Sequence, residues 1–432
     1  MSSFLPMPFA VEQHTTARTV APPALRRQPR PFLVPRADVP WASAMVLNPA
    51  IFRRAGEKRI HMLFRASGPG SPFAGRAAPL PYPICLGYAW SDDEGDTWTP
   101  DFSAPALYPR LRATFEELHV ELPSGRHVPD YANGCIEDPR LFDFDGGVYL
   151  SAACRIFPPG PYWLHDDPMQ CAPAWARQPD APGGRAVREN LTVTALWRVD
   201  LDALAARRYD RAFVYLGPLS DPGRSDNRDV FLFPEKLPID GKPACVMIHR
   251  PRTPRPYSAD CPDKPVMFIA AARSPEDLAT RAFLDQPLAA PLLDWEANRV
   301  GGSSPPLRID ARRWLLPYHG KKDDITGYTQ SFMILEDVPD GLPVLRHRAA
   351  ARLFHAEADW EREGEFTIPC VFTCGAIRSG DDLLMTYGAA DTVCGVARIN
   401  FAALVRFVET FDPQGESLRT NGNLHKSVIH DS

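Results

Sequence analysis

A short pattern of residues recurs along this chain of 432 residues and restricts its fold more than any other feature. The pattern is an amide or acidic residue, then proline, any residue, an aliphatic residue and phenylalanine. Its clearest copies are Asn48-Pro49-Ala50-Ile51-Phe52 and Asp138-Pro139-Arg140-Leu141-Phe142. At the same distance after each copy, a second apolar run leads to an arginine, Arg65 or Arg155. A polar residue, a strand, a turn and a second strand predict a repeated β-hairpin.

A looser third copy starts at Asp229 and leads to Arg250, and further units are predicted to start near Pro305 and Cys374. The units start about 70 to 90 residues apart, without a helical crossover between them. One four-stranded sheet cannot bury both of its faces, whereas a closed ring of sheets can. The chain is therefore predicted to be all-β, a five-bladed propeller at residues 41–410. An N-terminal extension at 1–40, a short helix at 401–411 and a C-terminal tail at 411–432 complete the prediction.

The position of the polar residue predicts where the chemistry lies. Proline has no N–H for a strand ladder and suits the first residue of a strand, which would place Asp138 at a strand mouth. The innermost strands of a propeller bring their first residues to one end of the central channel. The residues expected to meet there are Asn48, Asp138, Asp229, Arg65, Arg155, Arg250 and His319. Arg140 shares a face with Asp138 and is expected to keep its carboxylate ionised.

Composition excludes several classes of protein. The net charge of −5 gives no general attraction to nucleic acid or to an anionic membrane. The 47 prolines and 28 glycines suit a loop-rich all-β protein. The nine cysteines have neither disulfide-framework nor metal-site spacing, and neither a signal peptide nor a long apolar span is recognisable. We expect a cytoplasmic protein without a metal.

Three segments have separate interpretations. Residues 1–40 are rich in proline and arginine, which predicts either an arm that packs on a neighbouring subunit of a homo-oligomer or a mobile tail. The segments 158–182 and 252–300 are interpreted as inserts, the first facing the substrate. The stretch from Ser91 to Trp98 matches the Asp-box pattern, so it is predicted to be a structural hairpin turn with Trp98 between sheets.

The predicted set of side chains suits sugar chemistry. A funnel of carboxylates, arginines and a histidine fits a ligand with many hydroxyls together with an anion. A carboxylic acid can protonate a glycosidic oxygen while a nucleophile attacks the opposite face of the sugar. An inverting hydrolase needs a second carboxylate to activate water, whereas a cationic cluster favours an anionic nucleophile such as phosphate.

Over residues 41–410 the chain resembles glycoside hydrolase family 130, the β-mannoside phosphorylases and their relatives. The motifs that carry the resemblance are Asn48-Pro49-Ala50, Leu63-Phe64-Arg65-Ala66, Glu137-Asp138-Pro139-Arg140, Phe233-Pro234-Glu235-Lys236, His249-Arg250-Pro251, Tyr318-His319-Gly320 and Tyr387-Gly388-Ala389-Ala390-Asp391. The resemblance implies a five-bladed propeller and inverting phosphorolysis of a β-mannoside, of β-1,4-mannosyl or mannosyl-GlcNAc type, to α-mannose 1-phosphate. Phosphate would be the co-substrate, with no cofactor.

The resemblance also implies residue roles. Asp138 matches the proton donor, thought to act through a sugar hydroxyl. The residues that match the mannosyl-binding set are Asn48, Arg65 and Asp391, and those that match the phosphate-binding set are Arg228, Arg250, His319 and Tyr328. Lys236 is expected beside the phosphate cluster, among the substrate-binding residues. Many members have Arg-Asn or Lys-Asp where this chain has Arg228-Asp229, which leaves the subfamily open.

Several alternatives stay open. An inverting β-mannosidase would use Glu235 or Asp229 to activate water. A non-catalytic sugar-binding propeller would bind without turnover, and a sialidase would need an arginine triad and a Tyr/Glu pair. Arg155 is interpreted as an ion-pair partner within its blade. The aromatic residues interpreted either as sugar-stacking or as packing residues are Tyr88, Trp163 and Trp175.

Overall fold

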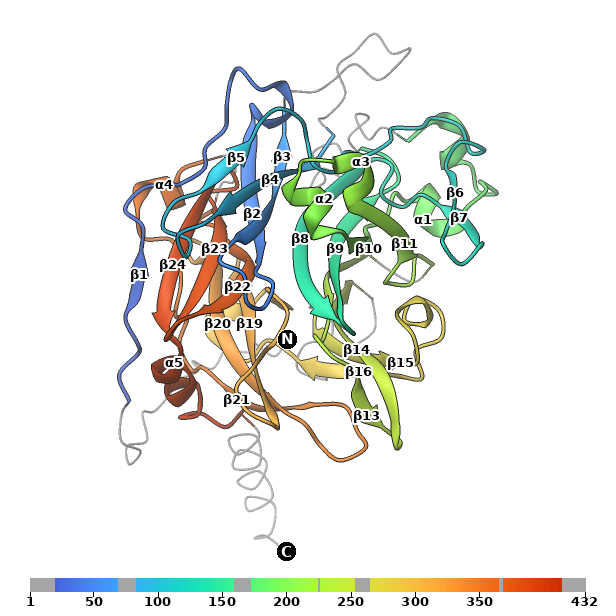
Figure 1. Ribbon diagram of the computed structural model, residues 1–432. Helices are drawn as coiled ribbons and strands as arrows, with labels where there is room; N and C mark the ends of the chain where they lie inside the picture. Colours follow the sequence, from blue (N-terminus) through green and yellow to red (C-terminus); the bar gives the residue numbers. More distant parts are fainter. Residues whose placement is uncertain are drawn as a thin grey trace, which may run out of the picture.

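Five antiparallel sheets stand around a common centre in the computed structural model, which describes residues 20–68, 83–158, 172–223, 226–252, 265–364 and 368–413 (Figure 1). The innermost strand of each sheet contacts a neighbouring sheet, and these contacts run all the way around the ring. This arrangement confirms the prediction of a five-bladed propeller.

The blades follow the chain in order. From the centre outward, blade one is β2 (Met45–Phe52), β3 (Ile60–Ser67), β4 (Cys85–Ser91) and β5 (Thr99–Asp101). Blade two is β8 (Cys135–Phe144), β9 (Gly147–Arg155), β10 (Val193–Val199) and β11 (Phe213–Pro218). Blade three is β12 (Asp226–Leu232), β14 (Lys242–Arg252), β15 (Met267–Ala272) and β16 (Leu284–Ala289), with β13 (Leu237–Ile239) paired to β14. Blade four is β17 (Arg299–Gly302), β19 (Arg313–Lys322), β20 (Gly327–Glu336) and β21 (Val344–Arg348), with β18 (Leu307–Arg308) paired to β19.

Blade five joins the two ends of the described chain. Its strands are β22 (Val371–Ser379), β23 (Asp382–Ala389), β24 (Val393–Asn400) and, outermost, β1 (Leu25–Arg27), which runs antiparallel to β24 (Figure 1). Arg27 on β1 donates to the buried carboxylate of Glu361 at 2.6 Å. Neither interpretation of residues 1–40 included this strand: part of the extension completes a blade of its own chain.

The segment 252–300 is not an insert over its described part. Residues 265–300 supply β15 and β16, which are the two outer strands of blade three, and the beginning of β17. The two strands were not recognised in the sequence because the long segment 273–283 separates their apolar runs. Most of the other segment, 158–182, lies outside the described residues, as does Trp163.

The remaining elements are short. They are the hairpin β6 (His119–Glu121) and β7 (His127–Pro129), the α-helices α1 (Gly184–Arg188), α2 (Leu201–Ala205), α3 (Tyr209–Ala212), α4 (Asp359–Arg362) and α5 (Phe401–Val408), and the 3-10 helices η1 (Pro40–Ala42), η2 (Ala174–Arg177), η3 (Pro275–Asp277) and η4 (Asp294–Glu296). The predicted C-terminal helix is α5, whose apolar side packs on blades four and five. Within the described ranges, no helix is long and apolar enough to cross a membrane.

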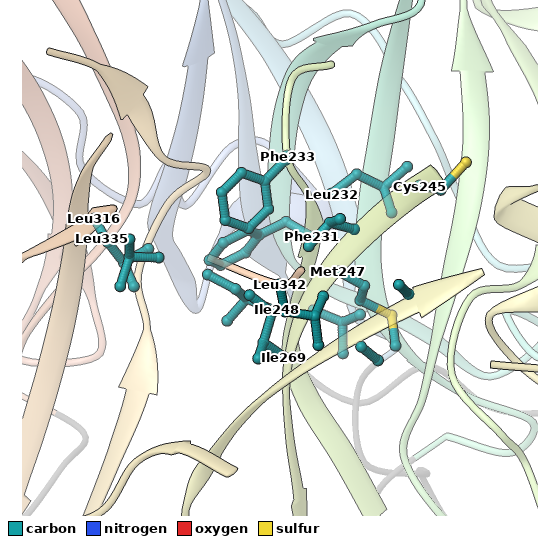
Figure 2. Close-up of a cluster of buried hydrophobic side chains, with 14 of the residues drawn as sticks. Phe231, Leu232, Phe233, Cys245, Met247, Ile248, Ile269, Leu316, Leu335 and Leu342 are labelled. Carbon is teal, nitrogen blue, oxygen red and sulfur yellow. The ribbon is translucent and has the colours of Figure 1, made fainter. Parts of the chain in front are cut away.

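Most blade strands are buried on both sides, because each blade packs against two neighbours. Every residue of β2 and β3 is buried, so these strands read as nearly continuous apolar runs. Between blades three and four, Phe231 on β12 and Phe233, which follows the end of β12, face the same core as Leu316 on β19 (Figure 2). This packing fixes the blades against one another, and with them the polar residues at their centre.

A bulge in the inner strand of three blades places these polar residues. The pairing of the two inner strands shifts register at Asn48, Asp138 and Asp229, which have positive φ angles of 48°, 53° and 56°. Asparagine and aspartate tolerate this left-handed conformation better than most residues. Pro139 lies at such a bulge, where no ladder bond is needed. The expectation that it begins a strand is therefore wrong, since β8 begins at Cys135.

The Asp-box turn lies where the first blade meets the last. Asp93 accepts hydrogen bonds from the backbone N–H and the hydroxyl of Thr97, at 2.9 and 2.5 Å. The ring of Trp98 packs against Phe32 with centroids 5.5 Å apart. Arg398 of blade five donates to Asp96 at 2.9 Å. The turn therefore supports the closure of the ring.

Candidate active site

The carboxylate of Asp138 is held by two residues of blade one. Asn48 donates its Nδ2–H to Asp138 Oδ1 at 2.7 Å, and Arg65 donates its Nη1–H to the same oxygen at 3.2 Å. The bulges of the two inner strands present Asn48 and Asp138 to each other across the blade boundary. The structure thus brings together the predicted proton donor and two of the residues predicted to bind the mannosyl unit.

Arg65 and Glu137 continue this network toward blade three. Arg65 Nη1 lies 3.2 Å from Glu137 Oε2, and Arg228 Nη1 lies 3.3 Å from Glu137 Oε1. Arg228 also donates to Thr192 Oγ1 at 2.9 Å. The buried carboxylate of Glu137 therefore bridges a cation of the sugar-binding set and a cation of the phosphate-binding set.

The surroundings of Asp138 favour its ionised form. Burial raises the pKa of this carboxyl, but the charges of Arg65 and Arg140 and the hydrogen bond from Asn48 outweigh burial, so the pKa lies below its usual value. The guanidinium of Arg140 acts from the backbone side, since its Nη1 donates to the carbonyl oxygen of Asp138 at 2.7 Å. Arg140 affects the charge of Asp138 as expected, although its direct contact is with the backbone.

A second buried carboxylate, Asp229, lies between three partners from three blades. Its Oδ1 accepts from Arg140 Nη2 at 3.1 Å, its Oδ2 accepts from Arg250 Nε at 2.6 Å, and His319 Nε2 lies 3.5 Å from Oδ2. Burial raises the pKa of Asp229, whereas these neighbours lower it far below its ordinary value. Asp229 is therefore an ionised carboxylate engaged in ion pairs.

His319 is a neutral imidazole in this cluster. Burial is the main cause that lowers its pKa to about 3, against the opposing charge of Asp229. Its ring lies 4.7 Å from that of Phe372 and 5.9 Å from that of Tyr328, between centroids. A neutral histidine can donate one N–H to an anion but adds no charge.

Positive charge accumulates around Arg250. Arg228 and Arg250 are directly opposite on paired strands, an arrangement that repels unless anions compensate. Burial lowers the pKa of Arg299, and the charges of Arg250 and Arg228 lower it further. Burial raises the pKa of Tyr328, while Arg299 and Arg250 act against that shift. These charges act on one another only at short range. All four residues predicted to bind phosphate, Arg228, Arg250, His319 and Tyr328, therefore lie near Arg299.

Arg299 is the main residue of the site that the sequence analysis missed. It lies at the start of β17, inside the segment interpreted as an insert. Its strand partner is Lys321, two residues beyond His319. The signal available in the sequence was the run Arg299-Val300-Gly301-Gly302, whose glycines allow close packing: a Cβ on Gly301 would lie 2.4 Å from Asp229 Oδ2.

Two predicted residues lie at the other end of the blades. Lys236 pairs with Asp145 at 2.6 Å, beyond the end of β8 opposite to Asp138, so the expectation that it lies beside the phosphate cluster is wrong. Glu235 pairs with Arg308. Both residues follow the end of β12, which carries the chain away from the site.

The other candidates divide between the site and the core. Burial raises the pKa of Cys370, and the charges of Asp391 and Asp138 raise it further, so Asp391 lies at the same end of the blades as Asp138. The charge of Arg155 lowers the pKa of Asp226 in blade three, where burial acts in the opposite direction. Tyr88 is buried, and its hydroxyl forms a hydrogen bond with His61 Nδ1 at 2.9 Å. Tyr88 is therefore a core residue.

The centre of the ring offers hydrogen-bonding atoms to a polar ligand. Among the described residues, no group of three or more histidine, cysteine, aspartate or glutamate side chains is arranged to hold a metal ion. Buried polar atoms without a hydrogen-bond partner lie at the centre of the ring: Asn48 Oδ1, Ser304 Oγ, His319 Nε2 and Thr373 Oγ1. Such atoms are rare in folded proteins and are common at sites that bind polar ligands.

Comparisons with known proteins agree with this geometry. The chain is 28% identical to a 1,2-beta-oligomannan phosphorylase of Thermoanaerobacter sp. (strain X514) over 375 residues, 86% of this chain and 95% of that protein. It is 34% identical to a beta-1,2-mannobiose phosphorylase of Listeria innocua over 193 residues, 44% of this chain and about half (48%) of that protein. A solved structure of beta-1,2-mannobiose phosphorylase from Listeria innocua superposes with a TM-score of 0.60 and 19% identity, covering 89% of this chain and 99% of that one.

The fold of that structure is the fold found here. The family model described as beta-1,4-mannooligosaccharide phosphorylase matches residues 189–410, which is just over half of the chain. The matched stretch contains the cationic cluster and ends after α5. This chain belongs to glycoside hydrolase family 130.

Proposed function

We propose that this protein is an inverting phosphorylase that cleaves a β-mannoside with inorganic phosphate and releases α-mannose 1-phosphate. The observation that carries the proposal is the single network of buried ion pairs that joins Asp138, through Arg65 and Glu137, to Arg228. It holds one acid and a group of cations in a fixed relation, as attack on the face opposite to a protonated leaving group requires.

In the proposed reaction a phosphate oxygen forms a bond with the anomeric carbon of the mannosyl unit as the glycosidic C–O bond breaks. Asp138 supplies the proton that the leaving oxygen takes up, through a hydroxyl of the sugar. Asn48, Arg65 and Asp391 bind the mannosyl unit, while Arg228, Arg250, Arg299 and Tyr328 hold the phosphate, with His319 as a neutral donor. Phosphate needs no general base, because it arrives as an anion.

Bound phosphate also favours the protonated form of Asp138. The pKa of Asp138 is below its usual value in the free protein, so the carboxyl is mostly ionised at neutral pH. A bound phosphate dianion opposes the positive charges that cause this shift, and so raises the pKa of Asp138 toward the working pH. Protonation of the acid and arrival of the nucleophile are then linked.

The competing hydrolase needs a carboxylate base, and its two candidates are poorly suited. Asp229 is ion-paired on both oxygens and its pKa is strongly lowered, so it is a weak base. Glu235 pairs with Arg308 at the far end of the blade. Both observations favour phosphorolysis over hydrolysis.

We propose a β-1,2-linked mannoside as the first substrate to test, because both curated relatives act on β-1,2-mannosides by their names. A β-1,4-mannosyl oligosaccharide and a mannosyl-GlcNAc disaccharide are the next, since the family model carries the β-1,4 name.

The test is product analysis from these substrates with and without phosphate. We expect α-mannose 1-phosphate only when phosphate is present. Equal release of free mannose in phosphate-free buffer would instead identify an inverting β-mannosidase. Binding of the sugars without turnover, both in the wild-type protein and in Asp138→Asn, would identify a sugar-binding propeller.

A further inference from the structure

Asp229 has no role in the reaction proposed above, yet three side chains of the site lie against its carboxylate: Arg140, Arg250 and His319. It is buried, with 3% of its surface exposed, and its two oxygens contact residues of blades two, three and four. Burying an ionised carboxylate is costly unless it is paired and hydrogen-bonded. A carboxylate that neither touches the reacting groups nor serves as a base therefore points to a positioning role.

One oxygen of Asp229 acts on the acid half of the site through Arg140. Each of the three nitrogens of the Arg140 guanidinium donates to a different acceptor: Nη2 to Asp229 at 3.1 Å, Nη1 to the carbonyl of Asp138 at 2.7 Å, and Nε to the carbonyl of Ser303 at 3.2 Å. Asp138 has a φ of 53°, a conformation that costs free energy in a non-glycine residue. Arg140 holds this backbone in place, and Asp229 holds Arg140.

The other oxygen acts on the cationic half. Arg250 donates to Asp229 through Nε at 2.6 Å, and an ion pair through Nε fixes the plane of the guanidinium. The two terminal nitrogens of a guanidinium oriented in this way can meet a phosphate in bidentate geometry. His319 Nε2 lies 3.5 Å from the same oxygen without a hydrogen bond, so the ring that faces Tyr328 and Phe372 packs beside the carboxylate.

The fold keeps room for this carboxylate. Gly301 on β17 lies so close that a Cβ at this position would be 2.4 Å from Asp229 Oδ2 and 2.7 Å from His319 Cε1. Any other residue would push the carboxylate away from Arg250. Glycine at this position is therefore a second, independent sign that the position of Asp229 matters.

We propose that Asp229 is a positioning residue that links the two halves of the site: it fixes the backbone of Asp138 through Arg140 and orients Arg250 for the phosphate. This inference rests on the proposed function, because it assigns Arg250 to the phosphate. It predicts that a change at Asp229 affects the phosphate and the acid together, and the mannoside much less.

The first experiment is Asp229→Asn in the full chain, with initial rates measured over phosphate concentration, mannoside concentration and pH. Asparagine has one acceptor atom where aspartate has two and carries no charge, so its side chain cannot accept from both Arg140 and Arg250, and we expect the KM for phosphate to rise about tenfold or more. The KM for the mannoside should stay within about twofold of wild type.

The pH profile gives a readout that general weakening of the fold would not produce. Without the charge of Asp229, the charge of Arg140 acts more strongly on Asp138 and lowers its pKa further. Because the acid must be protonated, the alkaline limb of kcat/KM should move down by about one pH unit. The charged and titratable groups that face Asp138 are Arg65, Glu137, Arg140, Arg228, Cys370 and Cys374.

The control is Asp143→Asn, which removes an exposed carboxylate from the far end of β8, the inner strand that carries Asp138 and Arg140. This variant should change neither the KM for phosphate nor the alkaline limb. If Asp229→Asn folds poorly, Gly301→Ala keeps every charge and displaces the carboxylate, and should also raise the KM for phosphate about tenfold. A variant that is folded and has a wild-type KM for phosphate and a wild-type alkaline limb overturns the inference, while the proposed function stands. A wild-type protein that releases sugar without phosphate overturns both.

Discussion

Arg65 Nη1 lies 3.2 Å from Asp138 Oδ1, although the two residues belong to different blades. The pair forms because the inner-strand bulge of blade two turns Asp138 toward the second strand of blade one. The acid is therefore assembled by the packing of two blades, and its chemistry depends on both.

Replacing the acid should abolish turnover without unfolding the protein. Asp138→Asn keeps the shape of the side chain and can still accept from Asn48 and Arg65 through its amide oxygen. We expect kcat to fall by about 10²–10⁴-fold, because the variant has no proton to give, and the KM for the mannoside to change little. Steady-state rates check this. A variant with more than a tenth of the wild-type kcat would remove Asp138 from the role of acid.

Arg299 should bind phosphate together with Arg250. Arg299→Gln removes one charge from the cationic cluster, and we expect the KM for phosphate to rise about 10- to 100-fold, the usual effect of losing a charged hydrogen bond. Arg312→Gln is the matched control, since Arg312 is an exposed arginine of the same blade that pairs with Glu336. Equal phosphate saturation curves for the two variants would contradict the assignment.

His319 should make stability depend on pH. The pKa of His319 is about 3 in the folded protein and about 6.5 in an unfolded chain, so only the unfolded state takes up this proton between those values. The free energy of unfolding therefore falls as pH decreases through this range, by up to about 1.4 kcal/mol per pH unit.

The measurement is urea unfolding of wild type and His319→Gln at pH 7 and pH 5. We expect the variant to lose less stability between the two pH values, by about 2 kcal/mol. His127→Gln, at an exposed position, should keep the wild-type pH dependence. The same loss of stability in His319→Gln and wild type would mean that the pKa of His319 is not lowered in the folded protein.

The ion pair that joins β1 to blade five should matter more than surface ion pairs. Glu361 has a fully buried side chain that pairs with Arg27 and accepts from Tyr387 at 2.8 Å. Arg27→Met leaves that charge without its cation, which typically costs about 3–5 kcal/mol. Arg26→Met on the same strand removes only an exposed arginine and should cost less than about 1 kcal/mol. Urea unfolding compares the two variants, and equal midpoints would contradict the prediction.

The sequence was informative about the inner strands because they carry a repeated pattern. Asn48, Asp138 and Asp229 were expected to meet, and they do so through equivalent bulges. The bulge itself could not be read from the pattern, since proline suits a bulge and the start of a strand equally well.

Positions that depend on long-range pairing were harder to predict. The strand β1 is three residues long, and nothing in Leu25-Arg26-Arg27 indicates a partner almost at the other end of the chain. Lys236 was expected beside the phosphate cluster because of the family resemblance, but the end of β12 carries it to the opposite end of the blade. Arg299 was missed because the segment around it was interpreted as an insert.

The strand β1 has a consequence for synthesis on the ribosome. It leaves the exit tunnel before every other described strand, whereas its partner β24 is the last described strand to be translated. Blades one to four can form while translation proceeds, but the nascent propeller stays an open arc with an unpaired sheet edge until β22, β23 and β24 have emerged. Arg27 and Glu361 then meet as the last step, so a ribosome that stalls before blade five is complete leaves a chain that cannot close.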